Sequence, residues 1–245
     1  MKLITLNTWG GQVHEILDFF KQYQEVDVFL LQEVFHNGTE RTVFDQKEKH
    51  QLFTEISECL PNHQGYFAPA VDDEWGLAIF IKKTIEVLEH GDSFMHLDRY
   101  SLIGQDATTV GRNLQFIKIS LNNQNLNILN FHGLWDNQGK LDTPARLEQA
   151  KKIITFGKDL SGETILAGDF NLRPDTESLN IIEKELSLKN LIKEYKIEST
   201  RTSYYSKPEK FADYILCSDS ITVKNFRALS EEVSDHKALL LEFIA

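Results

Sequence analysis

Short apolar segments recur along the whole 245-residue chain, and the spacing within each segment predicts its secondary structure. Short alternating or continuous apolar runs indicate strands, whereas apolar residues three and four positions apart indicate helices. The pattern predicts strands at Lys2–Asn7, Asp27–Gln32, Gly76–Ile81, Asn113–Leu121, Asn125–Phe131, Thr164–Ala167, Ala212–Cys217, Thr222–Ala228 and Ala238–Phe243. It predicts helices at His14–Gln24, Lys49–Leu60, Thr143–Leu160 and Glu177–Leu186.

The order of these elements favours an α/β fold in which two mixed β-sheets pack together. Helix-linked strands alternate with hairpin-linked strands, such as the pair joined by Asn122-Asn123-Gln124. A purely parallel, doubly wound sheet would lack such hairpins. We expect residues 1–245 to form a single domain with helices on its outer faces, since this length allows one large domain. Long loops are expected over 34–48, 91–112 and 200–211, where they would shape a substrate cleft.

Polar residues follow several of the apolar runs, at the positions where the predicted strands end. They are Asn7, Glu33, His132, Asp169 with Asn171, Asp213, and Asp235 with His236. Amides, carboxylates and imidazoles at the ends of core strands need a partner or a ligand. Strand ends converge in α/β proteins, so these side chains can form one cluster. Carboxylates, amides and histidines without cysteine have the composition of a hard-metal, phosphoryl-transfer site.

Taken singly, these residues also have structural explanations. Gly168-Asp169-Phe170-Asn171 has the composition of a turn, and Asp235-His236 is equally consistent with a loop pair. A lone histidine at a strand end, such as His132, is more often structural than catalytic. Glu33 follows a strand buried on both faces, which favours a cation as its partner over simple exposure. Asp213 lies inside a predicted strand and requires a partner, for which we expect a histidine.

Composition and charge limit the partners. An apolar fraction of 41% is typical of globular proteins, and no apolar run approaches the roughly 20 residues that span a bilayer. The N-terminus lacks the apolar stretch of a signal peptide, so we expect a complete, cytoplasmic protein without stable membrane insertion. The formal charge of -11 means that contact with nucleic acid would require a local basic patch. Cys59 and Cys217 match no metal spacing and are expected to be reduced packing residues rather than a disulfide.

The order of the motifs is more specific than any one of them. LNTW, LQEV, His132, GDFN, DYI and SDH, in that sequence, resemble the endonuclease/exonuclease/phosphatase superfamily over residues 3–243. GDFN and SDH are the sharpest elements, and the stretches GLAIFIKKTI and VGRNLQFIKI resemble the central strands of the family. The resemblance implies a four-layer α/β sandwich with the site between the two sheets. It also implies Mg²⁺ or Mn²⁺ as the cofactor.

The resemblance assigns part of the motif residues to a metal. Glu33 matches the main metal ligand, assisted by Asn7 and Asp235. Asp169 matches the residue that orients or deprotonates the attacking water, or that binds a second metal.

The resemblance assigns the other motif residues to the phosphate. Asn171 matches the donor that stabilises pentacovalent phosphorus, and His236 matches the imidazole that contacts the scissile phosphate, with Asp213 orienting it. His132 matches a second histidine, which contacts phosphate or protonates the leaving group in some members. Glu74 is a weaker match to an acid that supports this histidine.

Two further residues are candidates for substrate contacts. Arg112 precedes a predicted strand and is a candidate phosphate contact, with a surface arginine as the more ordinary alternative. Trp135 lies where many relatives have leucine and is expected to line the cleft. Phe211-Ala212 stands before Asp213 where many members have arginine or asparagine. Only Phe94–Ile103 offers a candidate apolar segment for membrane docking.

We therefore expect a divalent-metal-dependent phosphoesterase that hydrolyses a phosphodiester bond by in-line attack of water. A nuclease or DNA-end phosphodiesterase acting as a monomer is the first expectation, and His132 together with the acidic charge argues against abasic-site repair. A sphingomyelinase-like or other small-molecule phosphodiesterase or phosphatase is the alternative, supported by the acidity and by LNTWGG. A non-catalytic binding protein on the same fold is the third.

Overall fold

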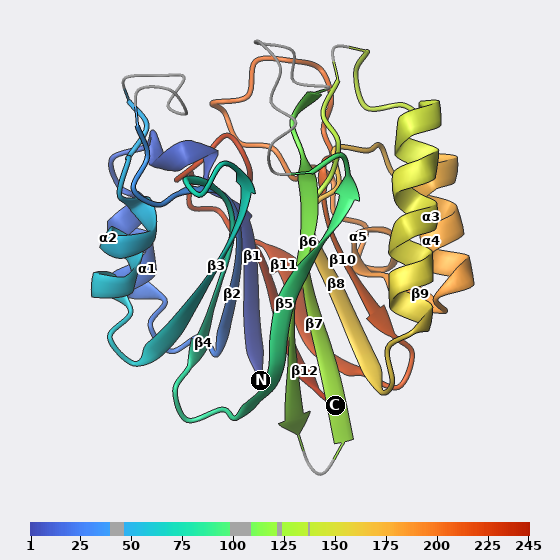
Figure 1. The fold of residues 1–245 in the computed structure, drawn as a ribbon, viewed down its shortest axis with the longest axis horizontal. Helices are drawn as coiled ribbons and strands as arrows, with labels where there is room; N and C mark the ends of the chain where they lie inside the picture. Colours follow the sequence, from blue (N-terminus) through green and yellow to red (C-terminus); the bar gives the residue numbers. More distant parts are fainter. Residues whose placement is uncertain (40–46, 99–108, 122–123, 137) are drawn as a thin grey trace.

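The computed structural model describes residues 1–39, 47–98, 109–121, 124–136 and 138–245. Two six-stranded sheets stack face to face, and helices cover the outer face of each (Figure 1). This arrangement confirms the predicted α/β sandwich of two mixed sheets with four layers.

The elements of the described residues divide between the two sheets. The first sheet contains β1 (Lys2–Asn7), β2 (Val28–Phe35), β3 (His63–Val71), β4 (Trp75–Lys82), β11 (Thr222–Ala228) and β12 (Leu239–Ile244). The second contains β5 (Val87–His96), β6 (Arg112–Leu121), β7 (Gln124–His132), β8 (Glu163–Asp169), β9 (Leu188–Asn190) and β10 (Asp213–Ser218). The helices are η1 (Trp9–Gly11), α1 (Ile16–Gln22), α2 (Leu52–Cys59), α3 (Pro144–Lys158), α4 (Glu177–Glu185) and α5 (Leu191–Glu194).

The two sheets have related topologies. Their strand orders are β11-β12-β1-β2-β4-β3 and β5-β6-β7-β8-β10-β9. Each contains one parallel pair, β1 with β2 and β7 with β8, while the other pairs are antiparallel. The carboxyl ends of the strands in a parallel pair lie side by side. Each sheet therefore presents the polar residues that end two neighbouring strands at one edge.

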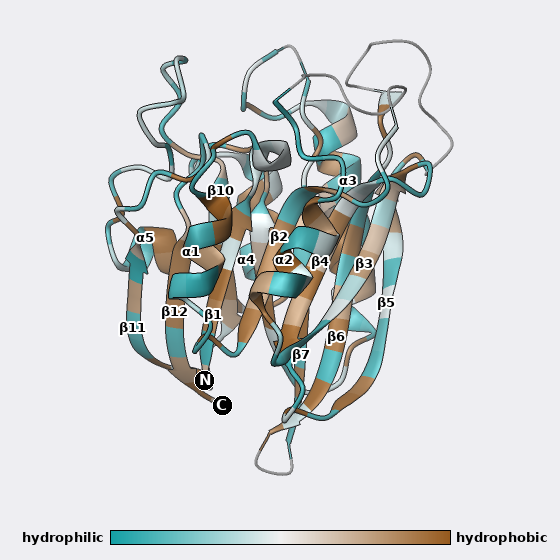
Figure 2. Cartoon of the chain, turned by 90° about the vertical axis from the view of Figure 1, so that its left-hand side faces the viewer, coloured by the Kyte–Doolittle hydropathy of each residue, from teal (hydrophilic) through white to brown (hydrophobic). Residues whose placement is uncertain are grey.

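The continuous apolar runs are explained by sheets that are buried on both faces. Leu3 and Leu30 belong to the large apolar cluster that includes Ile128 of β7. Their neighbours in sequence, Ile4 and Phe29, belong to the cluster that packs against α1 and α2. Because successive side chains of a strand point to opposite faces, both sets are buried. Figure 2 shows the apolar colouring concentrated in the strands, with hydrophilic loops above them.

Helix boundaries follow local sequence signals. Thr143 caps α3, which was predicted over Thr143–Leu160: its backbone is extended and its side chain accepts a hydrogen bond from the Arg146 N–H at 3.3 Å, with Pro144 next in the chain. The hairpin between β6 and β7 is confirmed by the pairing of Leu121 with Gln124, while 122–123 lie outside the described residues.

The expected loop 91–112 is partly wrong, and three edge strands, β3, β5 and β9, were not predicted. β5 continues to His96 and pairs with β6, β3 pairs with β4, and β9 pairs with β10. Most residues of β3 and β5 are half-buried or exposed, so no clean apolar alternation marks these strands, and β9 has only three residues. The candidate docking segment Phe94–Ile103 begins within β5, and its residues 99–103 lie outside the described residues.

Other expectations agree with the structure. Cys59 and Cys217 are both free and buried. Within the part of the chain that the structure describes, no helix has the length and apolar character needed to cross a bilayer.

A buried polar network joins the two sheets beneath their polar edge. Gln32 of β2 donates from Nε2 to Asn130 Oδ1 of β7 at 2.7 Å. Asn130 donates in turn to the Leu31 and Ala78 carbonyl oxygens at 2.9 and 3.2 Å. Such a network is favourable only with its geometry intact, so it sets the position of one sheet relative to the other.

We expect the buried His63 to make stability fall on acidification. Its Nε2 contacts the Val26 carbonyl oxygen at 2.7 Å, and burial lowers the pKa of the imidazole below its usual value. The neutral form therefore contributes stability above the unfolded pKa of about 6.5, and that stability is lost as pH falls from there toward the folded pKa.

The effect is measured by thermal unfolding at roughly pH 7.5 and pH 5.5, which lie on either side of the unfolded histidine pKa of about 6.5. The melting temperature of His63→Gln should decrease less between these two pH values than that of the wild type. His14→Gln, at an exposed position, is the control. An equal loss in wild type and His63→Gln would contradict the assignment.

Candidate active site

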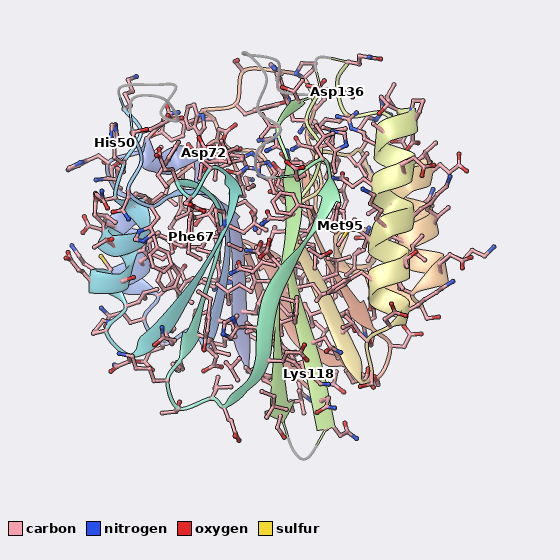
Figure 3. The ribbon with its side chains drawn as sticks, viewed as in Figure 1. His50, Phe67, Asp72, Met95, Lys118 and Asp136 are labelled. Carbon is pink, nitrogen blue, oxygen red and sulfur yellow. The ribbon has the colours of Figure 1, made fainter. Side chains whose placement is uncertain are left out.

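The predicted site residues gather at the polar edge of the sandwich, where the parallel strands end. In Figure 1 this is the upper end, opposite the two chain termini. At the opposite end the amino group of Met1 donates to the Phe243 carbonyl oxygen at 2.7 Å. Figure 3 places Asp136, from the loop after β7, in the upper region and Lys118 at the lower end.

Three site residues occupy neighbouring positions in the second sheet. His132 ends β7, Asp169 ends β8 and Asp213 begins β10. His132 is the register partner of Asp169, which is in turn the partner of Asp213. Asp213 is thus at the start of its strand rather than in its middle, and its predicted histidine partner is His236. The Nδ1 atom of His236 lies 2.8 and 3.0 Å from the two carboxylate oxygens of Asp213.

Glu33 lies within β2, and not after it as predicted. The pairing of β2 with β4 shifts register between Leu31 and Val34, and Glu33 has a positive φ of 57°. A bulge of this kind re-aims a side chain that would otherwise follow the alternation, and the left-handed backbone costs free energy in a non-glycine residue. The Thr8 hydroxyl contacts the Gln32 and Glu33 carbonyl oxygens, both at 2.9 Å, and supports this conformation.

Asn7 connects the two sheets at the centre of the site. Its Nδ2 donates to Glu33 Oε1 at 2.9 Å and to Asp169 Oδ2 at 3.0 Å, while its Oδ1 accepts the Trp9 N–H at 3.0 Å. The amide N–H groups therefore lie between two carboxylates, a position that suits a cation. Ligation by the Asn7 oxygen, as the resemblance implies, requires the amide to turn over.

The carboxylates carry opposite pKa shifts. Burial, assisted by Asp235 and Asp169, raises the pKa of Glu33 despite the hydrogen bond from Asn7. Burial acts in the same direction on Asp169, but His236, Lys140 and other cationic groups outweigh it and hold the pKa of Asp169 below its usual value. A divalent cation would favour the ionised form of both groups.

The donor atoms fit a hard metal. Ligand atoms of Glu33, His132 and Asp169 lie within 4.8 Å of one another, as do those of Asp169, Asp213 and His236. Oxygen donors with one imidazole suit Mg²⁺ or Mn²⁺. Asp235, the other predicted ligand, lines the same cleft, and its Oδ2 lies 3.2 Å from Arg201 Nη1.

His132 is held as a neutral imidazole. Its Nε2 lies 3.7 Å from Glu33 Oε1 and 3.8 Å from Asp169 Oδ2. Burial, together with Arg112, lowers the pKa of His132 well below its usual value. The Trp75 ring packs 5.6 Å from the imidazole. Glu74, the candidate supporting acid, accepts hydrogen bonds from the Thr39 backbone and hydroxyl, both at 2.8 Å.

Arg112 is a buried arginine, not the surface residue that its sequence context allowed. Only 5% of the residue is exposed, and its guanidinium carbon lies 5.3 Å from the centre of the Trp75 ring. Its Nε and Nη1 atoms are buried and have no hydrogen-bond partner among the residues that the structure describes. Burial lowers the pKa of Arg112 to about 10. An arginine with free donors beside a metal-binding cluster is suited to an anionic ligand.

Asn171 is oriented by three hydrogen bonds. Its backbone N–H donates to Asp169 Oδ1 at 2.8 Å, its Nδ2 donates to the Gly133 carbonyl at 3.2 Å, and its Oδ1 accepts from Lys140 Nζ at 2.6 Å. The positive φ of 54° at Asn171 is part of this turn. The amide nitrogen carries two hydrogens, of which one donates to Gly133. The second Nδ2 hydrogen can therefore donate to a ligand.

A buried arginine holds the loop that follows β7. Arg146 of α3 donates to the carbonyl oxygens of Leu134, Gly139 and Leu141 at 3.2, 2.7 and 2.5 Å, and its Nη2 lies 3.5 Å from Asp136. These contacts determine the course of the loop that carries Trp135 and Lys140.

The site opens into a cleft of about 580 Å³. The predicted residues Glu33, Arg112, His132, Trp135, Asp169, Asn171, Asp235 and His236 all line it. Trp9, Lys140, Arg201, Tyr204, Tyr205, Ser206 and Lys207 also line it and were not predicted. The expected loop over 200–211 supplies most of this second group. No spacing or neighbouring motif distinguishes Lys140 from a surface residue, whereas the aromatic and basic residues of RTSYYSK, which include Arg201, were a visible signal.

Comparison with known proteins gives the same family as the motifs. The sequence profile of the Endonuclease/Exonuclease/phosphatase family matches residues 4–236. No curated protein matches the chain.

Several solved structures have this fold. A mannosyl-6-phosphatase of Bacteroides thetaiotaomicron has a TM-score of 0.75 at 20% identity, with 100% of both chains covered. An endonuclease/exonuclease/phosphatase from Bacteroides vulgatus has a TM-score of 0.76 at 21% identity, covering 99% of this chain and 98% of that one. A humanized D. rerio TDP2 has a TM-score of 0.73 at 14% identity, covering 100% and 99%. At these identities the similarity shows a shared fold.

We expect Mg²⁺ or Mn²⁺ to stabilise the protein through Glu33. A ligand that binds only the folded state increases the free energy of unfolding, by about 2.7 kcal/mol at a hundred times its dissociation constant. The melting temperature therefore rises with the ligand concentration. Glu33→Gln should abolish most of the Mn²⁺-dependent rise in a thermal unfolding experiment. Asp175→Asn, which alters an exposed carboxylate paired with Arg173, is the control and should keep it. An undiminished rise in Glu33→Gln would remove Glu33 from the metal site.

Proposed function

The chain belongs to the endonuclease/exonuclease/phosphatase family, and we propose that it is a divalent-metal-dependent hydrolase that cleaves a phosphoric ester P–O bond by in-line attack of water. The main support is the group formed by the half-buried Glu33 and the buried Asp169 and His132 around the Asn7 amide, in a cleft that is also lined by Asn171 and His236.

The proposed metal site centres on Glu33. Glu33 would be the main ligand, with Asn7 and Asp235 as further ligands. The bound Mg²⁺ or Mn²⁺ would neutralise the charge that develops on the phosphoryl oxygens. The peptide around Glu33 is held by a bulge and by Thr8, which keeps the carboxylate in place before a substrate arrives.

We assign Asp169 to the attacking water. The depressed pKa of Asp169 means that the carboxylate is ionised at neutral pH and can accept a hydrogen bond from water. A carboxylate of low pKa is a weak base, so its main contribution would be to orient the water, with the proton transferred as the P–O bond forms. Asn7 and the Asn171 backbone N–H hold its two oxygens.

Asn171 and His236 would bind the phosphoryl oxygens. The free Nδ2 hydrogen of Asn171 and the Nε2 of His236 both face the cleft. Asp213 fixes the His236 ring through Nδ1. Burial disfavours a charged imidazole, but Asp213, Asp235 and Asp169 outweigh it and raise the pKa of His236, so the ring can donate from Nε2 to an anion.

His132 is a less suitable proton donor. Its strongly lowered pKa means that the ring carries no extra proton at neutral pH. Of the two roles implied by the resemblance, we therefore propose contact with phosphate rather than protonation of the leaving group.

The residues that line the cleft also bear on the class of substrate. A phosphodiester, with nucleic acid first, agrees with the family and with the aromatic and basic residues around the cleft, Trp9, Trp135, Tyr204, Tyr205 and Lys207. Base stacking on such rings does not depend on sequence. The overall charge of -11 restricts any nucleic-acid contact to this region and favours a short substrate.

Replacing a group at the centre of the reaction should abolish most activity. We expect Asp169→Asn and His236→Gln each to lower kcat by at least ~10²-fold, the usual effect of removing such groups. Release of nitrophenolate from bis-p-nitrophenyl phosphate, with Mg²⁺, Mn²⁺ or EDTA, is the measurement. The exposed substitution Lys152→Gln is the control. Activity of either variant within a few-fold of the control, or full activity in EDTA, would exclude this mechanism.

Salt separates nucleic acid from small phosphodiesters. Each released counterion adds to the salt dependence, so kcat/KM for single- or double-stranded DNA should fall steeply between 50 and 200 mM salt, by roughly 10³-fold or more if six or more phosphates are contacted. Turnover of bis-p-nitrophenyl phosphate should change much less. Equal salt dependence of both substrates would contradict a nuclease and leave a small phosphoric ester as the substrate.

A further inference from the structure

Two buried cations of the cleft, Lys140 and Arg201, have no role in the reaction as assigned so far. Lys140 is 4% exposed and Arg201 is 8% exposed, although both line the cleft. A buried cation is costly unless a charge or several hydrogen bonds compensate it. The contacts of Lys140 and of Arg201 indicate what kind of ligand would compensate the charge of each.

Lys140 has a neutral partner only. Its Nζ donates to Asn171 Oδ1 at 2.6 Å, and no carboxylate of the described residues lies within salt-bridge distance of it. The ammonium group is thus adjacent to the amide that is proposed to hold the scissile phosphoryl group. Arg146 fixes the loop that places it there.

Arg201 lies beside the other proposed phosphate ligand. Its Nη1 contacts His236 Nε2 at 2.5 Å and Asp235 Oδ2 at 3.2 Å, and its Nε is buried without a partner. Stacking on Tyr205, at 3.9 Å from the ring centre, fixes the guanidinium plane. The Arg201 guanidinium therefore lines the cleft beside His236, where it can donate to an oxygen atom of a bound anion.

The charge of the cleft exceeds that of a phosphodiester. Among the described lining residues, Arg112, Lys140, Arg201 and Lys207 are cationic, whereas Glu33, Asp169 and Asp235 are anionic. A bound divalent metal would leave three positive charges in excess, counting the His236–Asp213 pair as neutral. A phosphodiester carries one negative charge, whereas a phosphomonoester approaches two at neutral pH because its second pKa is about 6.

We propose that Lys140 and Arg201 make this site selective for a terminal, dianionic phosphoryl group, so that the substrate class is a phosphomonoester. This inference rests on the proposed phosphoric ester hydrolase function, and it replaces the phosphodiester named above with a phosphomonoester as the substrate class. Lys140 would donate to one non-bridging phosphoryl oxygen beside Asn171, and Arg201 to another beside His236. The third non-bridging oxygen of a phosphomonoester would accept from Arg112, whose Nε and Nη1 have no hydrogen-bond partner among the described residues; in a phosphodiester this third oxygen is esterified and uncharged, so one of the three cations would lose its partner.

The reaction balances as simple hydrolysis. The water oxygen forms a bond to phosphorus as the bond from phosphorus to the alcohol oxygen breaks. One water proton passes to Asp169 and on to solvent, and the leaving alkoxide takes a proton from solvent. The products are inorganic phosphate and an alcohol, and no oxidation or reduction occurs.

The test compares two substrates with one leaving group. p-Nitrophenyl phosphate is a dianion, and methyl p-nitrophenyl phosphate differs from it by one methyl group and one charge. The ratio of their kcat/KM values is measured with Mn²⁺ for wild type, Lys140→Met and Arg201→Gln, with the exposed Lys152→Met as the control. Differences in intrinsic reactivity cancel when the variant ratios are divided by the wild-type ratio.

We expect each variant to lower the monoester-to-diester ratio by about 10-fold or more, the order of effect seen for buried charge pairs, with the control unchanged. If Lys140 only orients Asn171, both substrates will slow equally. An unchanged ratio in both variants, or a wild-type preference for the diester that persists in them, overturns the inference while the hydrolase function stands.

Binding provides a reading that does not depend on turnover. Titration calorimetry with benzylphosphonate and its monomethyl ester, which cannot be hydrolysed, should show tighter binding of the dianion by about 10-fold, and this difference should shrink in Lys140→Met and Arg201→Gln. Absence of any metal-dependent turnover with the binding preference intact would contradict the hydrolase function alone. Equal binding of the two phosphonates would contradict the charge selectivity alone.

Discussion

Two carboxylates from different sheets, the half-buried Glu33 and the buried Asp169, meet at a single amide, and the arrangement of this end of the molecule depends on that contact. Asn7 donates to both carboxylates from one nitrogen atom. Two carboxylates this close repel each other and lose hydration, so they require positive charge or hydrogen-bond donors. The raised pKa of Glu33 is the sign of this cost. The same pair of oxygen ligands is what a divalent cation needs.

The surrounding fold keeps the carboxylates together against this cost. Next to this site, Gln32 and Asn130 connect the two sheets through buried hydrogen bonds. The bulge in β2 turns Glu33 out of the strand alternation, at the expense of a left-handed backbone. A left-handed backbone and buried polar side chains occur together at this edge, while two large apolar clusters form most of the rest of the core. Such a distribution is typical of a functional site that the remaining structure stabilises.

Charge is distributed unevenly over the molecule. The chain has a formal charge of -11, yet cationic residues outnumber carboxylates among the described residues that line the cleft. Arg112 begins β6, and the other cations come from the loops after β7 and before β10, which are held by Arg146 and by the bridge between Arg201 and His236. Low dielectric in the cleft strengthens their effect on an anion, whereas the acidic surface disfavours long polyanions. The geometry therefore supports a small or terminal phosphate better than a long duplex.

The sequence by itself determined the family, the two mixed sheets and most residues of the cluster, because each motif directly follows an apolar run whose period is visible in the chain. Edge strands β3 and β5 were missed, since half-buried strands carry no such period. Only the tertiary structure decided that Glu33 sits in a bulge and that Asn7 turns its nitrogen toward the carboxylates. It also decided that Lys140 and Arg201 are buried in the cleft. Burial of a lysine or arginine depends on contacts between segments far apart in the chain, such as Lys140 with Asn171 and Arg201 with His236, and the spacing of residues within one segment does not indicate them.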